Sequence, residues 1–335
     1  MTAAAPMNTD VQQGNPHPPS LAHQERVRQN RSASRADNTK RALAKNWALF
    51  AGWCSTRGTA PLPAAPEHVE EFLLYLAEDH PVHDRAGLLL RRGLKPSSID
   101  QALWAINTRH RMAGLPAPGE AEPVRIALAG IKRRKGTRRK QQAPLTIDHL
   151  RTIAFPDSLK GRRDKALLLV GFAGCFRRSE LVALRAEDVE ETPYGLRVLL
   201  RKSKTDPFGQ GAWVAIVAAA TYREACPVAA LRAWLLAAGI AEGPIFRSVS
   251  RGPRPRLGPR LSGVTVDTVV KWAARQCGLN PAAFGGHSLR AGYATYLAQL
   301  NRPPTLIARQ GRWKSLDMVL TYARDDVAKG LAGSY

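Results

Sequence analysis

Hydrophobic residues recur at helical spacing through the N-terminal third of the chain. From Lys40 to Cys54 the apolar side chains lie three or four positions apart, which places them on one face of a helix. Similar stripes follow Pro66, start at a capping serine at Ser98, and run from Pro123 to Ile131. Proline suits the first turn of a helix, and serine suits its cap. This pattern predicts an all-helical unit over residues 37–131.

The spacing changes in the second half of the chain. Apolar residues alternate in YGLRVLLRKSK (194–204) and again in AWVAIVA (212–218), on either side of the turn DPFGQG. Alternation with a period of two indicates a β-hairpin. Helices are predicted around it, beginning at Thr146, Arg163, Ser179, Pro227, Ser262 and His287. We therefore expect a mostly α fold, with an α-rich C-terminal domain that holds one small antiparallel hairpin.

Polar and basic segments mark the domain boundaries. Residues 1–36 lack periodicity and read as a flexible polar arm, and residues 132–143 form a basic linker before a larger domain over 144–335. Cations are dense from 132 to 140: Lys132, Arg133, Arg134, Lys135, Arg138, Arg139 and Lys140. We expect these side chains to contact a phosphate backbone. A solvated charge run or a localisation-like patch is the alternative.

The charge of the whole chain supports a nucleic-acid partner. Lys and Arg number 50 against 27 Asp and Glu, a formal net charge of +23. Such a field attracts polyanions. An anionic membrane surface is less favoured, because no basic amphipathic helix stands apart from the globular pattern. No apolar run reaches about 18 residues, and no secretory signal pattern begins the chain. We expect a cytoplasmic, DNA-associated protein.

The cysteine spacing and the absence of metal-binding and nucleotide-binding motifs argue against a metal site, a disulfide framework or an ATP site. Cys54, Cys175, Cys226 and Cys277 form no C-x-x-C pair and lie in apolar surroundings, as buried reduced thiols do. The chain has no H-E-x-x-H, no metal-type acidic cluster and no G-x-x-x-x-G-K-[ST] loop. We expect no metal, no other cofactor and no use of ATP.

A set of candidate site residues occurs in a characteristic order along the second half of the chain. Arg177 and Glu180 occur in GCFRRSEL, and Lys204 lies at the hairpin tip. His287 and Arg290 follow in GHSLRAG, and Trp313 and Tyr322 in GRWKSLDMVLTYAR. In this order and spacing the residues resemble the tyrosine recombinase, or phage integrase, family. The phrases FAGWCSTRG and PEHVEEFLLYLAE, together with a tryptophan where most members have histidine, look like the Cre branch.

These residues also suit phosphodiester chemistry. Planar guanidinium groups match the oxygens of a phosphate, so Arg177 and Arg290 would bind it from two sides. His287 and the Trp313 indole N–H would add donors. Tyr322 would be the nucleophile and Lys204 the general acid, with Lys202 as the alternative lysine. Glu180 would orient an arginine or His287 rather than act as a base.

Each of these positions has a plainer interpretation. Trp313 alone is compatible with a core residue, Tyr322 alone with a half-buried tyrosine, and any arginine with a simple phosphate contact. The resemblance implies a 3′-phosphotyrosine intermediate. It also implies a tail helix docked on a neighbouring subunit, for which Val327, Leu331 and Tyr335 are spaced suitably.

The resulting hypothesis is a site-specific DNA recombinase. It would act as a homotetramer on two duplex target sites of inverted-repeat type, with a helical DNA-binding unit before the catalytic domain. A type IB topoisomerase and a non-catalytic DNA-binding protein on the same scaffold are the alternatives. The region from Ser98 to Met112 and the loop from Arg251 to Arg260 are the candidates for reading bases, although phosphate contact suits each arginine equally.

Overall fold

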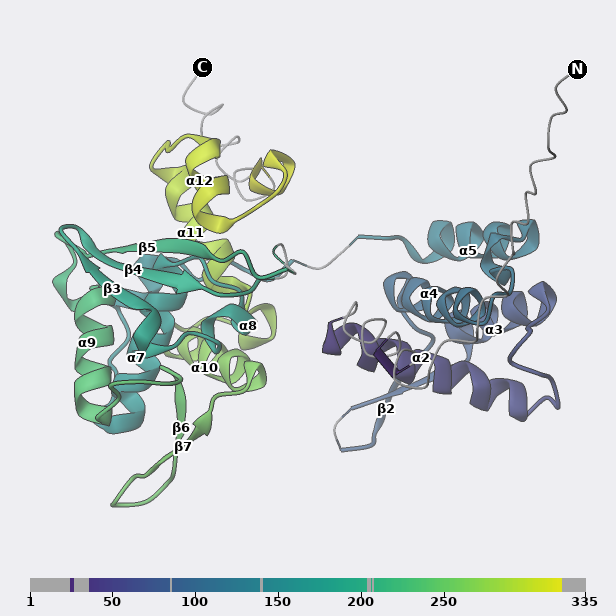
Figure 1. The fold of residues 1–335 in the computed structure, drawn as a ribbon, viewed down its shortest axis with the longest axis horizontal. Helices are drawn as coiled ribbons and strands as arrows, with labels where there is room; N and C mark the ends of the chain where they lie inside the picture. The colour runs from purple at the N-terminus through teal and green to yellow at the C-terminus, as the bar shows by residue number, and fades with distance from the viewer. Residues whose placement is uncertain are drawn as a thin grey trace, which may run out of the picture. The chain divides into compact units, whose positions relative to one another are not determined.

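The computed structural model describes residues 25–26, 36–84, 86–138, 141–203, 206 and 208–320. The chain divides into two compact units, residues 1–139 and 140–335 (Figure 1). Each unit has its own hydrophobic core.

From residue 36 onward, the described part of the N-terminal unit contains the helices α2 (Asp37–Ser55), α3 (Pro66–Glu78), α4 (Pro96–Met112) and α5 (Glu122–Lys135). The predicted helices are thus confirmed, although α4 begins at Pro96 rather than at Ser98. Aromatic rings fill the core between α2 and α3. The ring centroid of Phe72 lies 5.0 Å from that of Phe50 and 5.4 Å from that of Trp53. Burial of large aromatic surfaces is a major source of stability for a small helical unit.

Two features of this unit differ from the prediction. A short antiparallel pair, β1 (Pro81–His83) and β2 (Leu89–Arg92), follows α3, so the unit is not all-helical. Both strands are largely exposed and carry no alternating burial that the sequence would reveal. In addition, α5 continues through Lys135. Lys132 to Lys135 are therefore the last turn of a helix rather than part of a linker, and cations are favourable at that end of the helix dipole.

Seven helices and two small sheets are described in the C-terminal unit. The helices are α6 (Ile147–Arg151), α7 (Leu159–Ala173), α8 (Arg178–Leu181), α9 (Pro227–Ala238), α10 (Gly263–Gln276), α11 (Ser288–Gln299) and α12 (Pro304–Gly311). Short 3₁₀ turns connect some of them. Helix α7 is buried along most of its length and packs against α9, α10 and α11. It is the centre of this unit.

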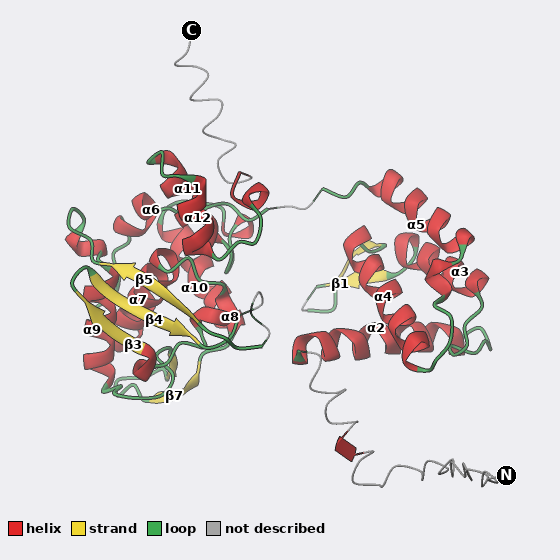
Figure 2. Ribbon diagram, turned by 45° about the horizontal axis from the view of Figure 1, so that its top comes forward, coloured by secondary structure: helices red, strands yellow, loops and turns green. Residues whose placement is uncertain are grey.

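The predicted hairpin is present as β4 (Gly195–Leu200) and β5 (Ala212–Val217), and β3 (Val189–Thr192) extends it to a three-stranded antiparallel sheet. Leu196 pairs with Ile216 and Val198 with Val214, and all four side chains are buried. Figure 2 shows this sheet lying over α7 and α9. The apolar side chains that alternate along the hairpin in the sequence therefore face the core.

A second pair, β6 (Arg247–Val249) and β7 (Leu257–Arg260), forms where a Pro/Gly-rich loop was expected. The stretch between the strands keeps that basic, exposed character. The root of the hairpin is held by Arg247, whose Nε donates to the Gly258 carbonyl at 2.8 Å. Short strands with proline and partial exposure give no periodic signal, which explains the difference.

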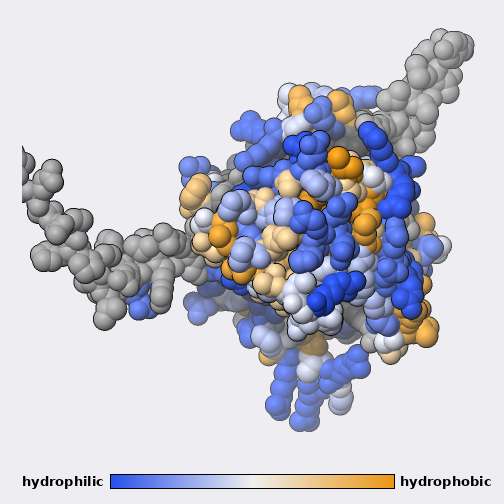
Figure 3. All heavy atoms as spheres, turned by 90° about the vertical axis from the view of Figure 1, so that its right-hand side faces the viewer, coloured by the Kyte–Doolittle hydropathy of each residue, from blue (hydrophilic) through white to orange (hydrophobic). Residues whose placement is uncertain are grey.

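Figure 3 shows polar side chains over most of the visible face, with smaller hydrophobic groups between them. No helix in the described ranges is both long and apolar enough to cross a membrane.

Helix α11 approaches the strand-like segment before α6 very closely. The Leu145 backbone N–H donates to the Ser288 carbonyl at 3.0 Å. A Cβ atom on Gly292 would lie 2.0 Å from the Leu145 carbonyl oxygen. Only glycine permits this approach, which fixes the position of the helix that begins with His287 and Arg290.

We therefore expect Gly292→Ala to destabilise the C-terminal unit by about 1–3 kcal/mol or more, because a fixed backbone oxygen cannot move aside. Thermal unfolding of the full chain followed by calorimetry measures this. Gly263→Ala is the matched control, since its Cβ would meet the Arg178 Cδ atom at an ordinary 3.6 Å. Equal melting temperatures for the two variants would contradict the prediction.

Candidate active site

Arg177 lies in the turn between α7 and α8, where Glu180 holds it at two points. The Arg177 backbone N–H donates to Glu180 Oε2 at 3.0 Å, and its Nη1 donates to Oε1 at 2.6 Å. Helix α8 begins at Arg178, directly after Arg177, so it starts earlier than the predicted position at Ser179. The Glu180 carboxylate accepts the backbone N–H of the residue that precedes the helix, as the glutamate of a capping box does.

Glu180 is an anion buried among cations. The residue is 3% exposed, and Arg312 Nη2 donates to its Oε2 at 2.9 Å. Burial alone would raise the pKa of Glu180, but Arg312 and the hydrogen bonds from Arg177 outweigh it and hold the pKa below its usual range. A carboxylate in this state accepts hydrogen bonds. Its geometry suits the orienting role expected for it.

Arg290 lies in the first turn of α11 and is 3% exposed. Its Nη1 donates to the Cys175 carbonyl at 2.8 Å, and its guanidinium carbon lies 4.0 Å from the centroid of the Trp313 ring. Burial lowers the pKa of Arg290 to about 10, so it is still a cation at neutral pH. Within the described residues its Nη2 atom is buried and has no hydrogen-bond partner.

His287 precedes α11, and two side chains hold the loop in front of it. Gln142 Oε1 accepts the His287 backbone N–H at 2.9 Å, and Asp267 Oδ1 accepts the Gly286 N–H at 2.6 Å. Sequence reasoning missed both Gln142 and Asp267. The Gly285–Gly286 pair is the signal that was present. A Cβ on Gly285 would lie 2.4 Å from Gln142 Nε2, and one on Gly286 2.8 Å from Asp267 Oδ1.

Trp313 follows the end of α12 and is half-buried. It packs against a small cluster of Ala294, Ile307 and Val319 and lays its ring on Arg290. Both interpretations of this tryptophan therefore have support, because the same ring fills a minor core and contacts an arginine of the site. A cation over an aromatic face contributes about 0.5–2 kcal/mol.

The structure thus brings Arg177, Glu180, His287, Arg290 and Trp313 to one face of the C-terminal unit. Lys204 and Tyr322, the expected general acid and nucleophile, lie outside the described residues, as do Arg139 and Lys140. Within the described ranges, no group of three or more His, Cys, Asp or Glu side chains is arranged to hold a metal ion. All four cysteines are free thiols, as expected, with Cys277 only partly buried.

The basic residues expected to contact DNA differ in their surroundings. Lys132 Nζ lies 2.7 Å from Asp100 Oδ1, and Arg134 Nη2 lies 3.0 Å from Glu78 Oε1. Both pairs are largely exposed, so each is worth little in stability. Arg133, Lys135 and Arg138 are exposed.

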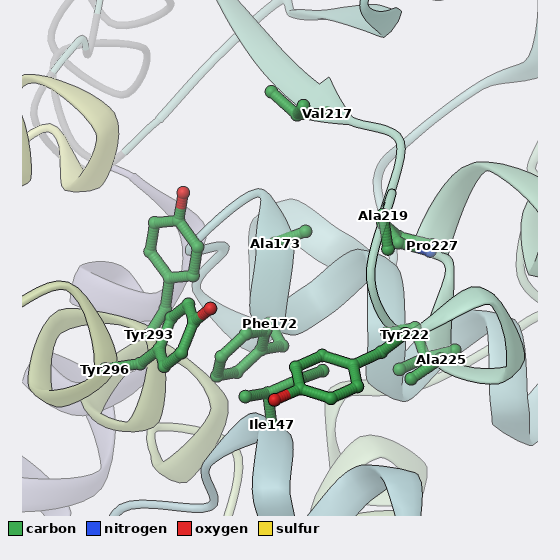
Figure 4. Close-up of a pocket in the computed structure, with 11 residues that line it drawn as sticks. Ile147, Phe172, Ala173, Val217, Ala219, Tyr222, Ala225, Pro227, Tyr293 and Tyr296 are labelled. Atoms are coloured by element: carbon green, nitrogen blue, oxygen red, sulfur yellow. The ribbon is translucent and has the colours of Figure 1, made fainter. Parts of the chain in front are cut away.

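An apolar pocket of about 270 Å³ lies elsewhere in the same unit (Figure 4). Phe172 from α7 and Tyr293 and Tyr296 from α11 line it, with Tyr222 on the opposite side. Burial raises the pKa of Tyr293 to about 12, so this phenol stays neutral. No charged side chain lines the pocket, which makes it unsuitable for a phosphate.

Comparison with known proteins gives a consistent result. A model of the Phage integrase family matches residues 139–329. The chain is 38% identical to an "Integrase/recombinase xerD homolog" of Selenomonas ruminantium, over 86% of this chain and 82% of that protein. It is 25% identical to "Recombinase cre" of Escherichia phage P1, over 87% of this chain and 84% of that protein.

Solved structures share the fold. The Tn1549 transposon integrase in complex with transposon right end DNA superimposes with a TM-score of 0.57 at 17% identity, covering 93% of this chain and 98% of the other. The XerH site-specific recombinase bound to palindromic difH substrate gives a TM-score of 0.52 at 17% identity, covering 81% and 72%.

The surroundings of His287 predict a shifted titration. Loss of hydration and then the positive charges of Arg290, Arg178 and Arg177 lower its pKa from 6.5, and Asp267 opposes them. We expect a ring that is mainly neutral at pH 7 and takes up a proton at a lower pH than an ordinary histidine. Because the folded-state pKa is the lower one, this group costs stability only as the pH falls through about 6.5.

Ring-proton NMR of the full chain, with the His287 signal assigned from His287→Gln, measures this pKa. Arg178→Gln should raise it, because one neighbouring cation is lost and Asp267 loses the arginine it pairs with. Asp267→Asn should lower it. A pKa at or above 6.5 in the unaltered protein would show that the arginines do not act on this ring.

Proposed function

Because the chain belongs to the phage integrase family, and is therefore a tyrosine site-specific recombinase that cleaves and rejoins DNA, we propose that Arg177 and Arg290 bind the scissile phosphate. The observation that carries this proposal is the state of Arg290. A charged donor that is buried without a partner costs free energy, and an anion at Nη2 would relieve that cost. Arg177 is held beside it by Glu180.

In this proposal His287 and Trp313 add hydrogen-bond donors to the same phosphate. Charge on the non-bridging oxygens rises as phosphorus is attacked, and donors fixed in advance stabilise that charge without reorganisation. A neutral His287 has one N–H to donate. Trp313 is kept next to Arg290 by the contact between its ring and the guanidinium.

We further propose Tyr322 as the nucleophile and Lys204 as the general acid. The Tyr322 oxygen would bond to phosphorus as the phenol loses its proton. The bond from phosphorus to the 5′ oxygen would break, and Lys204 would protonate that oxygen. The product is a 3′-phosphotyrosine ester and a free 5′ hydroxyl. Attack by a 5′ hydroxyl then reverses the step, so the bond energy is conserved and no ATP is required.

The assembly and the branch are also part of this proposal. The XerH site-specific recombinase is bound to a palindromic substrate, which supports a duplex of inverted-repeat type as the substrate here. Exchange between two sites calls for a tetramer with closed cyclic contacts. Trp313 supports placement in the Cre branch, whereas overall identity is higher to the xerD homolog.

The first test is Tyr322→Phe on a suicide substrate, a duplex nicked close to the scissile phosphate. The unaltered protein should form a covalent adduct that survives denaturing electrophoresis, and the variant should form none, because the phenol oxygen is the attacking atom. Binding of uncut duplex should be equal for both proteins. An adduct formed by Tyr322→Phe would exclude this nucleophile. Relaxation of supercoiled DNA that has no paired target sites would favour a topoisomerase.

A second test concerns the basic end of α5. If Arg133 contacts a phosphate, Arg133→Gln should make the slope of log K against log salt less steep by about 0.9, since one fewer counterion is released. Arg232→Gln is the control. Arg232 lies on α9, at the opposite side of the C-terminal unit from α8 in both ribbon views. Equal slopes for Arg133→Gln and the unaltered protein would remove Arg133 from the interface.

A further inference from the structure

We infer that Arg312 is a positioning residue for DNA cleavage: its guanidinium joins the end of α12 to the turn that holds Arg177 and Arg290. This inference rests on the proposed function of that site. Arg312 belongs to no part of the motif that identified the site, and its role depends on where the fold places it.

Arg312 contacts the α7–α8 turn at three acceptors. Its Nη2 donates to Glu180 Oε2 at 2.9 Å and to the Cys175 carbonyl at 3.1 Å, and its Nη1 lies 3.3 Å from the Gly174 carbonyl. Nη1 also donates to the Gln310 carbonyl at 2.8 Å, within its own segment. A planar guanidinium is suited to hold several oxygens in one fixed geometry.

The same acceptors hold the two arginines proposed to bind phosphate. Glu180 accepts from Arg177, and the Cys175 carbonyl accepts from Arg290. Arg312 therefore shares one partner with each of them. If the Arg312 side chain were lost, each shared acceptor would lose one of the donors that fix its position.

Arg312 also changes the net charge of the cluster. Arg177, Arg290 and Arg312 carry three positive charges around the single negative charge of Glu180, so the cluster has a net charge of +2. Without Arg312 the net charge is +1, and Glu180 neutralises Arg177 alone. Arg312 thus compensates the carboxylate and leaves the charges of Arg177 and Arg290 for the phosphodiester.

The backbone at this position points to the same conclusion. Arg312 has φ 56° and ψ 43°, in the left-handed region that glycine adopts easily. For an arginine this conformation costs about 1–2 kcal/mol. Contacts of the side chain must offset that cost. The next residue is Trp313, which lies on Arg290, and the same segment continues towards Tyr322.

Arg312→Gly in the full chain is the informative variant, because glycine adopts this left-handed backbone without strain while the whole Arg312 side chain, guanidinium included, is removed. We expect the rate constant for adduct formation at saturating suicide substrate to fall by about 100-fold, the scale expected when reacting groups shift by about 1 Å. The dissociation constant for uncut duplex should change by less than about threefold. Arg309→Ala removes an equal charge from the exposed side of α12 and should leave the rate within about threefold.

Two further measurements separate positioning from a general loss of structure. Arg312→Lys keeps the charge and should recover part of the rate lost in Arg312→Gly. In a Glu180→Gln background Arg312→Gly should cost less than it does alone, because the carboxylate that Arg312 compensates has been removed. The melting temperature of each variant reports whether it is folded.

The inference is overturned if Arg312→Gly cleaves within about twofold of the unaltered protein. It is also overturned if Arg312→Gly weakens DNA affinity without lowering the rate constant at saturating substrate. A double variant whose loss of rate equals the product of the losses in Arg312→Gly and Glu180→Gln would overturn it as well. Should Arg312→Gly fail to fold, the same cycle with Arg312→Lys decides the question. Absence of an adduct from the unaltered protein would instead overturn the proposed function.

Discussion

The arrangement of the site depends on one buried carboxylate. Glu180 is almost inaccessible to water, and an anion in such a position is tolerated only when cations and hydrogen-bond donors surround it. Its partners come from the start of α8 and from the end of α12, which are far apart in the sequence. Both elements must therefore be in place before the carboxylate is satisfied. The contacts that satisfy the Glu180 carboxylate during folding are thus the same contacts that place Arg177.

Around this anion most of the remaining charges are positive, and Asp267 near His287 is the exception. Arg290 and His287 both have pKa values lowered by burial and by neighbouring cations, so these side chains repel one another. Two close approaches through glycine, at Gly292 and at the Gly285–Gly286 pair, keep the elements near each other despite this repulsion. A phosphodiester bound as proposed would supply negative charge to these cations, whose positions are fixed in advance.

Sequence patterns predicted the elements of this fold better than the contacts between them. Periodicity located the helices and the β4–β5 hairpin, because the apolar face of each element is buried against the core of its own unit. The β1–β2 and β6–β7 pairs escaped notice because their side chains are exposed and irregular in spacing. The motif residues were found by order and chemistry. Gln142, Asp267 and Arg312 were missed because each acts on a distant partner, largely backbone, and nothing local distinguishes one arginine among many.

The helical state of Lys132 to Lys135 changes the meaning of the basic run. Successive residues of a helix point about 100° apart, so four of them face all directions around the axis and cannot all approach one surface. Lys132 and Arg134 turn back to α4 and α3, where they meet Asp100 and Glu78. Both cations are thus engaged in exposed ion pairs within the N-terminal unit. Fewer cations of this segment are therefore available to an external anion than its composition suggests. Which side of α5 they face is set by the orientation of the helix in its unit.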